Sequence, residues 1–277
     1  MKILILGAGY VGRRVADTLR EAGHTVWTVR RTPQPDDPFA IAGDLTRPES
    51  IHLPGPVDRV VYCAGLQGAA LEDYRSLFVE GFSRVVSWVK TQGTIDRMLF
   101  TSTTGIYSVV DGRWVNETTE PNPVREVARC YREAEQLLGG SGLAHIVVRL
   151  SGIYGPERCR WIRLVREGQA RRLPGSPRFM NHIHVEDAAR AIVHLLHHPE
   201  PDSLYIASDH QPVDRNELIT FLAETMHLPT PPFLPDDASP PLGRGGNKRC
   251  DSTKLRESGF SFRFPTYREG YTPLIRL

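Results

Sequence analysis

Residues 2–12 decide the fold of this chain, and they read Lys2-Ile-Leu-Ile-Leu-Gly-Ala-Gly-Tyr-Val-Gly12. The continuous apolar run at 2–6 predicts a buried strand, and apolar residues between 11 and 22 recur at helical spacing. Between them, three glycines fit the pattern G-x-G-x-x-G of a turn that binds a dinucleotide pyrophosphate. Gly7 permits the tight turn, Gly9 lets the ligand approach the backbone, and Gly12 lets the helix pack closely on the strand.

The alternation of strand and helix continues outward from this turn. Further strands are predicted at residues 25–29, 40–42, 59–62, 97–100 and 145–150. Helices are predicted at 77–89 and at 123–138, the second with Asn122 as its cap residue and proline at its first position. Strands joined by helices imply right-handed crossovers. The sequence therefore predicts an α/β fold of the Rossmann type, a doubly wound parallel sheet.

The C-terminal part of the chain is less regular. We expect a helix at 185–197, a strand at 204–206, a helix at about 216–227, and a long loop at 228–246, which holds six prolines. The predicted domains are an NAD(P)-binding domain at 1–155 and a small C-terminal substrate lobe at 156–277. Residues 181–210 are expected to return from this lobe and pack on the first domain.

Composition and charge exclude several classes of protein. Apolar residues are 40% of the 277 residues, too large a share for an intrinsically disordered chain. With 34 basic and 32 acidic residues, the net charge is +2, which gives no reason to bind nucleic acid or an anionic membrane. No run of about eighteen apolar residues predicts a transmembrane helix, and residues 3–12 lack the cleavage pattern of a signal peptide. We therefore expect a cytoplasmic protein.

Cysteines and histidines do not suggest a metal site. The four cysteines, at 63, 130, 159 and 250, lie far apart in the sequence and are predicted to be reduced thiols. His194, His197 and His198 have helical spacing, but no carboxylate or cysteine stands at a matching position. We expect these histidines on an exposed helix face, and no bound metal.

Two arginines bear on the choice of dinucleotide. An acidic residue about twenty positions after the glycine turn would bind the ribose 2′-hydroxyl of NAD. This chain has Arg30 and Arg31 at the end of the second predicted strand. A guanidinium group can pair with a 2′-phosphate through two hydrogen bonds. The sequence therefore favours NADP, while NAD stays possible if both arginines are only surface charges.

Six further segments resemble those of one protein family, in the same order along the chain. Gly43-Asp-Leu-Thr46, Tyr62-Cys-Ala-Gly65 and Phe100-Thr-Ser-Thr-Thr-Gly-Ile-Tyr107 come first; Arg149-Leu-Ser-Gly-Ile-Tyr-Gly-Pro156, Asn181-His-Ile-His-Val-Glu-Asp187 and Tyr205-Ile-Ala-Ser-Asp209 follow. Together they resemble the extended short-chain dehydrogenase/reductases, and above all the atypical branch that is similar to nucleoside-diphosphate-sugar epimerases and dehydratases.

The resemblance, the glycine turn and the arginine pair together give a set of predicted cofactor-binding residues. These are Gly7, Gly9, Tyr10, Val11, Gly12, Arg30, Arg31, Asp44, Leu45, Cys63, Ala64, Gly65, Thr101, Ser151 and Ile153.

The chain departs from the family at its catalytic pair. Family enzymes use a tyrosine as acid and base, with a lysine four residues later that lowers the tyrosine pKa. One alignment places Val127 at the tyrosine position and Tyr131 at the lysine position; the other places Tyr131 and Glu135 there. Neither alignment restores the pair. We favour the first, because Thr103 and Val127 are 24 residues apart, closer to the family's usual gap than the alternative of 28.

Three residues are candidates for catalysis. The resemblance implies that Thr103 polarises the substrate oxygen, although a strand-end hydroxyl can also bond to the main chain. Tyr107 faces either the substrate or the core. Tyr131 either supplies a displaced phenol to the nicotinamide or its ribose, or is a buried tyrosine. His184 and Asp187 resemble a segment that organises the second lobe.

The arginines between Arg158 and Arg172, with Trp161 among them, either clamp the phosphates of a nucleotide-linked substrate or lie on a solvated helix. We expect an NADP(H)-binding oxidoreductase or epimerase-like protein that acts on a nucleotide sugar or another carbonyl or alcohol substrate. The alternative is a non-catalytic NAD(P)-binding sensor or scaffold. The expected partner is a small-molecule substrate, with neither nucleic acid nor membrane, and the oligomeric state is left open.

Overall fold

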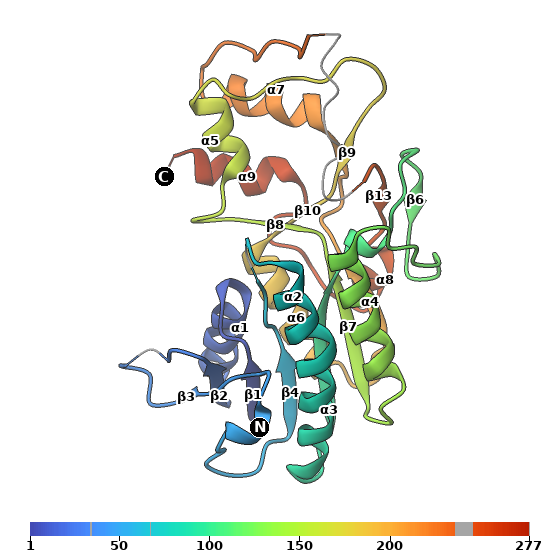
Figure 1. Cartoon of the computed structure of the whole chain (residues 1–277). Coiled ribbons are helices and arrows are strands. Elements are labelled where there is room, and N and C mark those ends of the chain that lie inside the picture. Colours follow the sequence, from blue (N-terminus) through green and yellow to red (C-terminus); the bar gives the residue numbers. More distant parts are fainter. Residues whose placement is uncertain (34, 67, 236–245, 277) are drawn as a thin grey trace. The chain divides into compact units, whose positions relative to one another are not determined.

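The computed structural model describes residues 1–33, 35–66, 68–235 and 246–276 (Figure 1). The chain divides into two compact units. Unit 1 consists of Met1–Ile106, Pro123–Arg149 and Ala189–Tyr205, and unit 2 of Tyr107–Asn122, Leu150–Ala188 and Ile206–Leu277. The predicted boundary after residue 155 and the predicted return of 181–210 stay predictions.

Unit 1 is built on a seven-stranded parallel sheet with the order β11-β7-β5-β4-β1-β2-β3. Its strands are β1 (Lys2–Leu6), β2 (Thr25–Arg30), β3 (Ala40–Ala42), β4 (Arg59–Tyr62), β5 (Arg97–Thr103), β7 (His145–Leu150) and β11 (Leu204–Ala207). The strand order reverses direction between β1 and β4, because the chain runs from β1 out to the edge strand β3 and then returns to the other side of β1 as β4. The predicted doubly wound sheet of the Rossmann type is confirmed.

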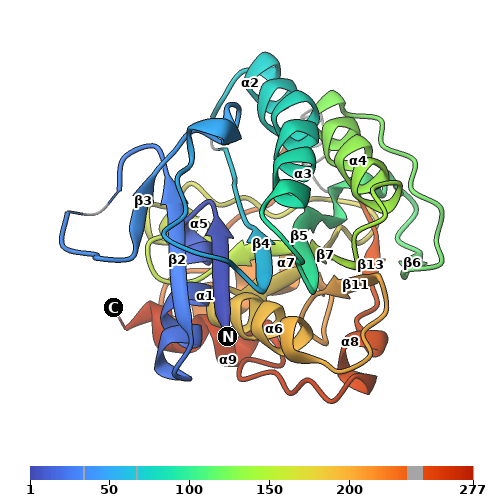
Figure 2. The same cartoon turned by 90° about the horizontal axis from the view of Figure 1, so that it is seen from below.

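Helices cover both faces of this sheet. In Figure 2, α3 (Phe82–Thr91) and α4 (Glu126–Gly139) lie on one face, and α1 (Tyr10–Glu21) and α6 (Val185–His197) lie on the other. The apolar stripe of α1 is buried at Val11, Val15 and Leu19, as its helical spacing predicts. Gly23, with φ of +82°, follows the helix, and the His24 amide donates to the Leu19 carbonyl (3.1 Å) to close its last turn.

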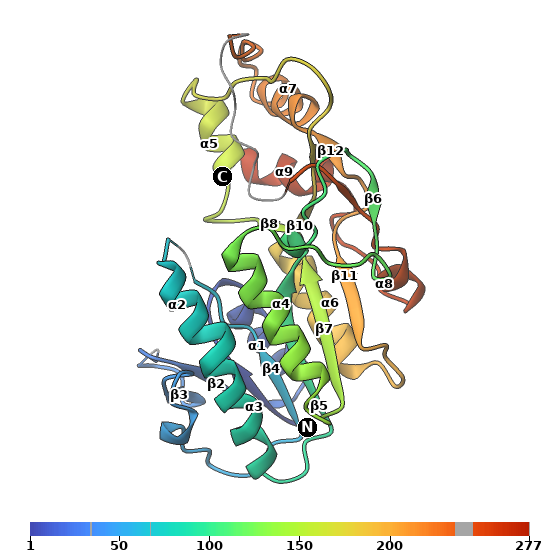
Figure 3. The same ribbon diagram turned by 45° about the vertical axis from the view of Figure 1, so that its right-hand side comes forward.

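The helix predicted at 77–89 begins earlier than expected. It forms one helical stretch of α2 (Leu71–Arg75), a π-helical turn (Ser76–Gly81) and α3, as Figure 3 shows. At the end of the π turn, a β-carbon on Gly81 would lie only 3.1 Å from the Leu45 carbonyl oxygen. The glycine therefore lets the helix approach the loop after β3 closely.

The prediction that Asn122 caps a helix starting at residue 123 is wrong. The helix α4 begins at Glu126, and Arg125, with ψ of 135°, is its N-cap. The side-chain oxygen of Asn122 instead accepts a hydrogen bond from the Ser108 amide (2.9 Å). Because this tertiary contact occupies the side chain, it cannot cap the helix.

Unit 2 is built from short elements. Its helices are α5 (Arg160–Arg166), α7 (Arg215–Thr225), α8 (Thr253–Glu257) and α9 (Tyr267–Ile275). Its strands form three pairs: β8 (Gly152–Tyr154) with β10 (His182–His184), β9 (Phe179–Met180) with β12 (Val213–Asp214), and β6 (Trp114–Val115) with β13 (Arg249–Cys250). A core cluster from α5, α7 and α9 includes Ile162, Leu218, Leu222, Tyr267 and Tyr271.

Part of the predicted loop at 228–246 can be placed. Within it, the Leu234 amide donates to the Arg172 carbonyl (2.8 Å), and the Arg172 guanidinium lies over the Phe233 ring at 4.1 Å. Residues 236–245 of the loop lie outside the described residues. None of the helices in the described part of the chain combines the length and apolar composition needed to span a bilayer.

Candidate functional site

The glycine turn between β1 and α1 has three different local environments. Gly7 has φ of +102°, and a β-carbon on it would lie 2.5 Å from the Ala64 backbone. A β-carbon on Gly12 would lie 2.2 Å from the Gly7 carbonyl oxygen. At Gly9, by contrast, nothing lies within 4 Å of an added β-carbon. The turn is therefore tightly packed at Gly7 and Gly12 and open over Gly9, at the N-terminus of α1, where backbone amides favour an anion.

A cavity of about 680 Å³ opens at this turn, at the carboxyl ends of β1 to β4. It brings together eight of the predicted cofactor-binding residues: Gly7, Gly9, Arg30, Arg31, Asp44, Leu45, Ala64 and Gly65. Ligands of doubly wound sheets bind at this edge, where the strand order reverses. The cavity is thus in the position that such a ligand requires.

Four further residues after β4 line the cavity: Ala69, which precedes α2, and Asp73, Ser76 and Leu77, which belong to the helical stretch. None of them is among the predicted cofactor-binding residues, and the predicted helix begins only at residue 77. The π turn begins at Ser76, and such turns occur often at functional sites. A serine and an aspartate beside the turn carry no sequence signal that separates them from surface residues.

Asp44 forms a compact turn at the end of β3. Its Oδ1 accepts hydrogen bonds from the Thr46 amide (2.9 Å) and the Thr46 hydroxyl (2.8 Å). The hydrogen bond from the Thr46 amide is the main cause of the lowered pKa of Asp44, so the carboxylate stays charged at neutral pH. The carboxylate therefore holds Leu45 and Thr46 as one wall of the cavity.

Three other predicted cofactor residues do not line this cavity. Val11 is buried in α1, and Tyr10 lies under the Arg14 guanidinium, 4.5 Å from its ring centre. Cys63 is buried, which raises the pKa of its thiol to about 12. The thiol is therefore neutral at physiological pH.

The remaining predicted cofactor residues follow strands further along the sheet. Thr101 is buried in β5, where its hydroxyl donates to the Tyr62 carbonyl (3.2 Å). Ser151 and Ile153 belong to unit 2. There the Ser151 amide donates to the Ala207 carbonyl (3.0 Å), and Ile153 pairs with Ile183 between β8 and β10.

Two of the catalytic candidates have main-chain partners. The Thr103 hydroxyl, at the end of β5, accepts a hydrogen bond from the Gly105 amide (3.0 Å) and keeps its own proton to donate. Tyr107 is buried in unit 2, and its hydroxyl donates to the Asn116 carbonyl (2.9 Å). The catalytic roles of Thr103 and Tyr107 stay predictions.

Tyr131 lies on α4 within an aromatic cluster. Its ring centre is 4.3 Å from that of Phe78 and 6.5 Å from that of Phe100. Burial raises the pKa of Tyr131, and the nearby Tyr74 and Cys63 raise it further. Its hydroxyl has no hydrogen-bond partner in the described part of the chain and is not among the fully buried polar atoms there. The phenol is therefore neutral and able to donate to a ligand.

Glu135 is held in a buried network that bears on the alignment of α4. Its Oε1 accepts from the Ser102 hydroxyl (2.6 Å), and its Oε2 accepts from Nη2 of Arg149 (2.7 Å). With both oxygens bonded between β5 and β7, Glu135 cannot stand in for the lysine of a catalytic pair. The alignment that places Val127 and Tyr131 at the two catalytic positions stays a prediction.

Histidines and arginines singled out in the sequence have ordinary structural contacts. His197 is half-buried, and its Nε2 lies 3.0 Å from Nε2 of His24. No group of three metal-ligating side chains occurs among the described residues.

In the arginine-rich segment, Arg166, Arg171 and Arg172 donate to main-chain carbonyls. Its helix, α5, spans only Arg160–Arg166.

Comparison with known proteins places the chain in a family. The sequence model of the NAD dependent epimerase/dehydratase family matches residues 3–207. A solved structure from Methylobacillus flagellatus, described as an NAD-dependent epimerase/dehydratase, is 30% identical, with a TM-score of 0.80 over 99% of this chain and 97% of that one. No curated protein matches the chain.

Two further structures share the fold at lower identity. MoeE5 in complex with UDP-glucose and NAD is 23% identical, with a TM-score of 0.81 over 100% of this chain and 98% of that one. The human epimerase family protein SDR39U1 with NADPH is 16% identical, with a TM-score of 0.79 over 100% and 99% of the two chains. From the match over most of its length, this chain belongs to the NAD-dependent epimerase/dehydratase family.

Proposed function

We propose that this protein binds NADP(H) in the cavity at the glycine turn and exchanges hydride with a carbonyl or alcohol carbon of a small substrate. The observation that carries the proposal is the turn itself. It is closed by packing at Gly7 and Gly12 and open over Gly9, beside the N-terminus of α1. Free helix amides and an open backbone face fit a pyrophosphate.

The cofactor of similar proteins supports the same site. The MoeE5 structure contains NAD, and the human SDR39U1 structure contains NADPH. In this chain Arg30, at the end of β2, lines the cavity where the adenosine ribose of such a cofactor would lie. A cation there suits a 2′-phosphate, which a carboxylate would repel. For this reason we favour NADP(H) over NAD(H).

The family and one neighbour indicate which substrate class to test first. MoeE5 is described with UDP-glucose, so a nucleotide sugar is the first substrate to test. The bound nicotinamide would supply or accept the hydride. The chain would supply the Thr103 hydroxyl, which can donate to the substrate oxygen because its own acceptor role is satisfied by the Gly105 amide.

Proton transfer would differ from that of a tyrosine–lysine pair. No lysine lies in α4, and burial raises rather than lowers the pKa of Tyr131. The phenol would therefore keep its proton and act as a hydrogen-bond donor to the nicotinamide ribose. A water molecule, or the substrate itself, would take the role of base.

A second candidate function is that of a non-catalytic NADP(H) sensor. It is favoured by the raised pKa of Tyr131, which makes this residue a poor proton acceptor, and by the alignment that puts Val127 at the position of the usual base. A sensor would keep the cavity and the glycine turn, which are both present.

The two functions can be separated with the purified protein. Calorimetry with NADPH and NADH measures binding, and single-turnover absorbance of the reduced nicotinamide with a panel of nucleoside-diphosphate sugars measures hydride transfer. Binding followed by transfer supports the enzyme. Saturable binding without transfer across the panel supports the sensor, and no binding of either nucleotide contradicts both.

A further inference from the structure

Two histidines from distant parts of the sequence meet in unit 1. His24 stands directly before β2, and His197 is the last residue of α6. Their Nε2 atoms lie 3.0 Å apart, and both side chains are half-buried. The contact lies at the amino ends of the parallel strands, whereas the cofactor cavity lies at their carboxyl ends. This histidine pair, His24 and His197, therefore has no part in the proposed function.

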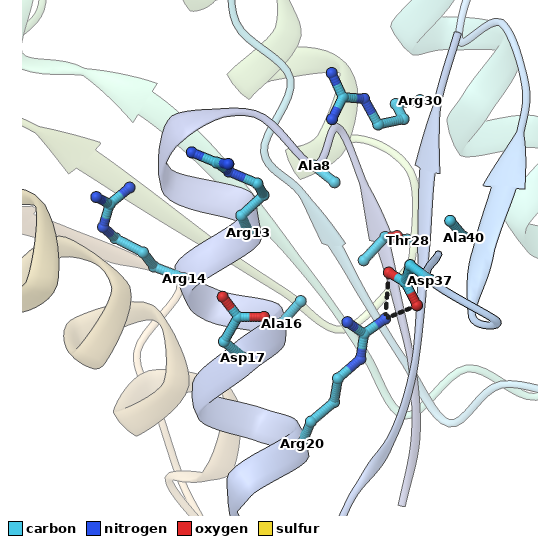
Figure 4. A pocket seen from close by; sticks show the side chains of 10 residues that line it. All are labelled: Ala8, Arg13, Arg14, Ala16, Asp17, Arg20, Thr28, Arg30, Asp37 and Ala40. Atoms are coloured by element: carbon cyan, nitrogen blue, oxygen red, sulfur yellow. Dashed lines mark hydrogen bonds and ion pairs between the residues drawn. The ribbon is translucent and has the colours of Figure 1, made fainter. Parts of the chain in front are cut away.

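The backbone on the His24 side of the contact is held in place. The His24 amide closes the last turn of α1. In the same turn, Arg20 donates to the Val26 carbonyl of β2 (2.9 Å) and pairs with Asp37 (3.0 Å). Figure 4 marks this ion pair with dashed lines, beside a cavity of about 430 Å³ that is also lined by Arg13 and Arg30. The turn that carries His24 is thus fixed to both α1 and β2.

Two arginines hold the end of α6 on the other side of the contact. Arg59, at the start of β4, donates to the Leu196 carbonyl. Arg97, at the start of β5, donates to the carbonyls of Leu196 (3.2 Å) and His198 (2.8 Å). The carbonyls at a helix C-terminus attract cations. Because these guanidinium groups already occupy them, a positive charge on His197 gains little from the helix end.

The hydrogen bonds of His197 decide where the ring protons of the pair lie. Nδ1 of His197 is 2.8 Å from the Val193 carbonyl, which can only accept, so this nitrogen carries a proton. In neutral His197, Nε2 is then the acceptor, and the proton between the two rings belongs to Nε2 of His24. Nδ1 of His24 is left as an acceptor, 3.3 Å from the Met1 amine.

The charges around His24 oppose a second charged imidazole. Burial is the main cause of a lowered pKa of His24, and the Met1 amine, His197 and Arg59 lower it further. Each of these three groups is a base, so none of them is an anion that could offset an imidazolium ion.

Further titratable groups stand at the same ends of the strands and of α6. They are Lys2, Asp58, Asp96, Arg97, His194 and His198. Of the two carboxylates, Asp58 accepts from the Lys2 amide (2.7 Å), and the charge of Asp96 acts on Arg97. Neither is among the groups whose charge shifts the pKa of His24.

We propose that the histidine pair is a pH-sensitive latch, which holds the end of α6 to the turn before β2 and opens on acidification. A proton taken up from water has two places to go. On Nδ1 of His24 it stands beside the Met1 amine. On Nε2 of His197 it occupies the atom that accepts the bond between the rings. Either position weakens the latch, and two charged rings would have an N–H on both Nε2 atoms and no acceptor between them.

The sign of the pH dependence follows from proton linkage. The folded state takes up a proton at His24 less readily than the unfolded chain does. The contribution of the latch to stability is therefore complete above about pH 6.5, the pKa of a histidine in an unfolded chain, and is lost as the pH falls.

The first test is nuclear magnetic resonance of the full chain with ¹⁵N-labelled histidines. At about pH 7.5, long-range ¹H–¹⁵N spectra should place the ring proton of His24 on Nε2 and that of His197 on Nδ1. The variants His24→Gln and His197→Gln assign the two sets of signals. A proton on Nδ1 of neutral His24 would overturn the proposal, because its Nε2 could not then donate to His197.

The second test is urea unfolding at a series of pH values. His24→Ala removes the bond and should raise the unfolding constant about 2- to 10-fold at about pH 7.5. His24→Gln supplies an amide N–H in place of Nε2–H and does not titrate. It should match the unaltered protein at about pH 7.5 and become the more stable of the two as the pH falls below about 6.5.

The matched control is His52→Gln. His52 is an exposed histidine of unit 1 whose Nδ1 lies 2.9 Å from the Ser50 carbonyl, and no second imidazole bonds to it among the described residues. This variant should follow the unaltered protein at every pH. Amide hydrogen exchange locates the effect: at about pH 5, protection in the last turn of α6 should fall relative to β1 in the unaltered protein but not in His24→Gln.

Two results of these measurements overturn the latch. One is a ratio of unfolding constants between His24→Gln and the unaltered protein that stays constant from about pH 7.5 to about pH 5. The other is a loss of protection at the end of α6 that is the same in both proteins. Neither result bears on nucleotide binding, because His24 and His197 do not line the cofactor cavity.

Discussion

Glu135 on α4 and Arg149 on β7 form a buried ion pair, with Oε2 2.7 Å from Nη2 and side chains only 3% and 2% exposed. The second carboxylate oxygen accepts from the Ser102 hydroxyl on β5 (2.6 Å). This relationship joins three elements of unit 1. Tyr131 stands one helical turn before Glu135 and therefore lies on the same face of α4.

Breaking this pair should destabilise the protein strongly. Glu135→Gln leaves the Arg149 guanidinium buried without its anion, which typically costs about 3–5 kcal/mol. The free energy of unfolding from urea titration measures the loss. Glu133→Gln is the control, because Glu133 forms an exposed pair with Arg75 at 3.8 Å that is worth about 0–1 kcal/mol. Equal losses of unfolding free energy in the two variants would contradict the buried ion pair between Glu135 and Arg149.

Two glycines of the same turn should respond in opposite ways to substitution by alanine. Gly9→Ala should abolish nucleotide binding with a smaller loss of stability than Gly12→Ala, because the new methyl group enters only the open space over the turn. Gly12→Ala should unfold more easily, by about 1–3 kcal/mol or more, because the methyl group would lie 2.2 Å from the Gly7 carbonyl oxygen.

Both glycine variants are tested by calorimetry with NADPH, which measures binding, and by thermal denaturation, which measures stability. Unimpaired binding by Gly9→Ala would mean that no ligand approaches the turn.

Tyr131→Phe tests the phenol as a hydrogen-bond donor. The ring contacts with Phe78 should remain, so stability should stay unchanged, while loss of one neutral hydrogen bond should raise the dissociation constant for NADPH about 2- to 10-fold. Because burial raises the pKa of Tyr131, the effect should not vary between pH 6 and about pH 9. The contrary result would be a dissociation constant for NADPH that changes with pH near neutrality in the unaltered protein but not in Tyr131→Phe. It would show that the phenol ionises in that range.

Asp209 should give unit 2 a characteristic dependence of stability on pH. Its side chain is 1% exposed, Oδ2 has no partner among the described residues, and burial, with Glu269 and Asp187 nearby, raises its pKa well above the usual value. The folded state therefore holds the proton more tightly than the unfolded state. Its stabilising contribution is complete below about pH 4, the pKa of an unfolded aspartate, and is lost as pH rises toward the folded pKa.

The variant Asp209→Asn removes this titration. Relative to the unaltered protein, it should gain free energy of unfolding as the pH rises above about 4. Buried His182 acts in the opposite sense, because burial lowers its pKa to about 4, so its contribution is lost as pH falls from about 6.5. Urea titrations over this range, with exposed Asp36→Asn as control, measure the difference. If the free energies of unfolding of Asp209→Asn and of the unaltered protein differed by the same amount at every pH, the raised pKa of Asp209 would be contradicted.

Much of unit 1 could be predicted from local patterns. The apolar runs of β1, β4 and β7 and the helical spacing of α1 are properties of neighbouring residues, which set the backbone hydrogen bonds of a strand or helix directly. The roles of the three glycines at the turn could also be predicted, because they depend only on the absence of a side chain. The match of the family to residues 3–207 agrees with the fold expected from those patterns.

Where the patterns failed, a distant contact had intervened. Asn122 has the sequence of a helix cap, yet its side chain binds the Ser108 amide, and α4 starts at Glu126 instead. The π turn at Ser76–Gly81 ends where Gly81 lies close to the Leu45 backbone. Neither contact leaves a periodic signal, because the partner residues are far away in the chain.

The sequence by itself determined the strand–turn–helix unit, the alternation of elements and the absence of a lysine from α4. Only the tertiary structure decided that Glu135 pairs with Arg149 and Ser102, that burial raises the pKa of Tyr131, and that Arg13 and Arg30 border one cavity. The reason is physical. Backbone propensity acts over a few residues, whereas burial, pKa and the pairing of charges depend on which atoms the completed sheet and its helices bring within a few ångströms of each other.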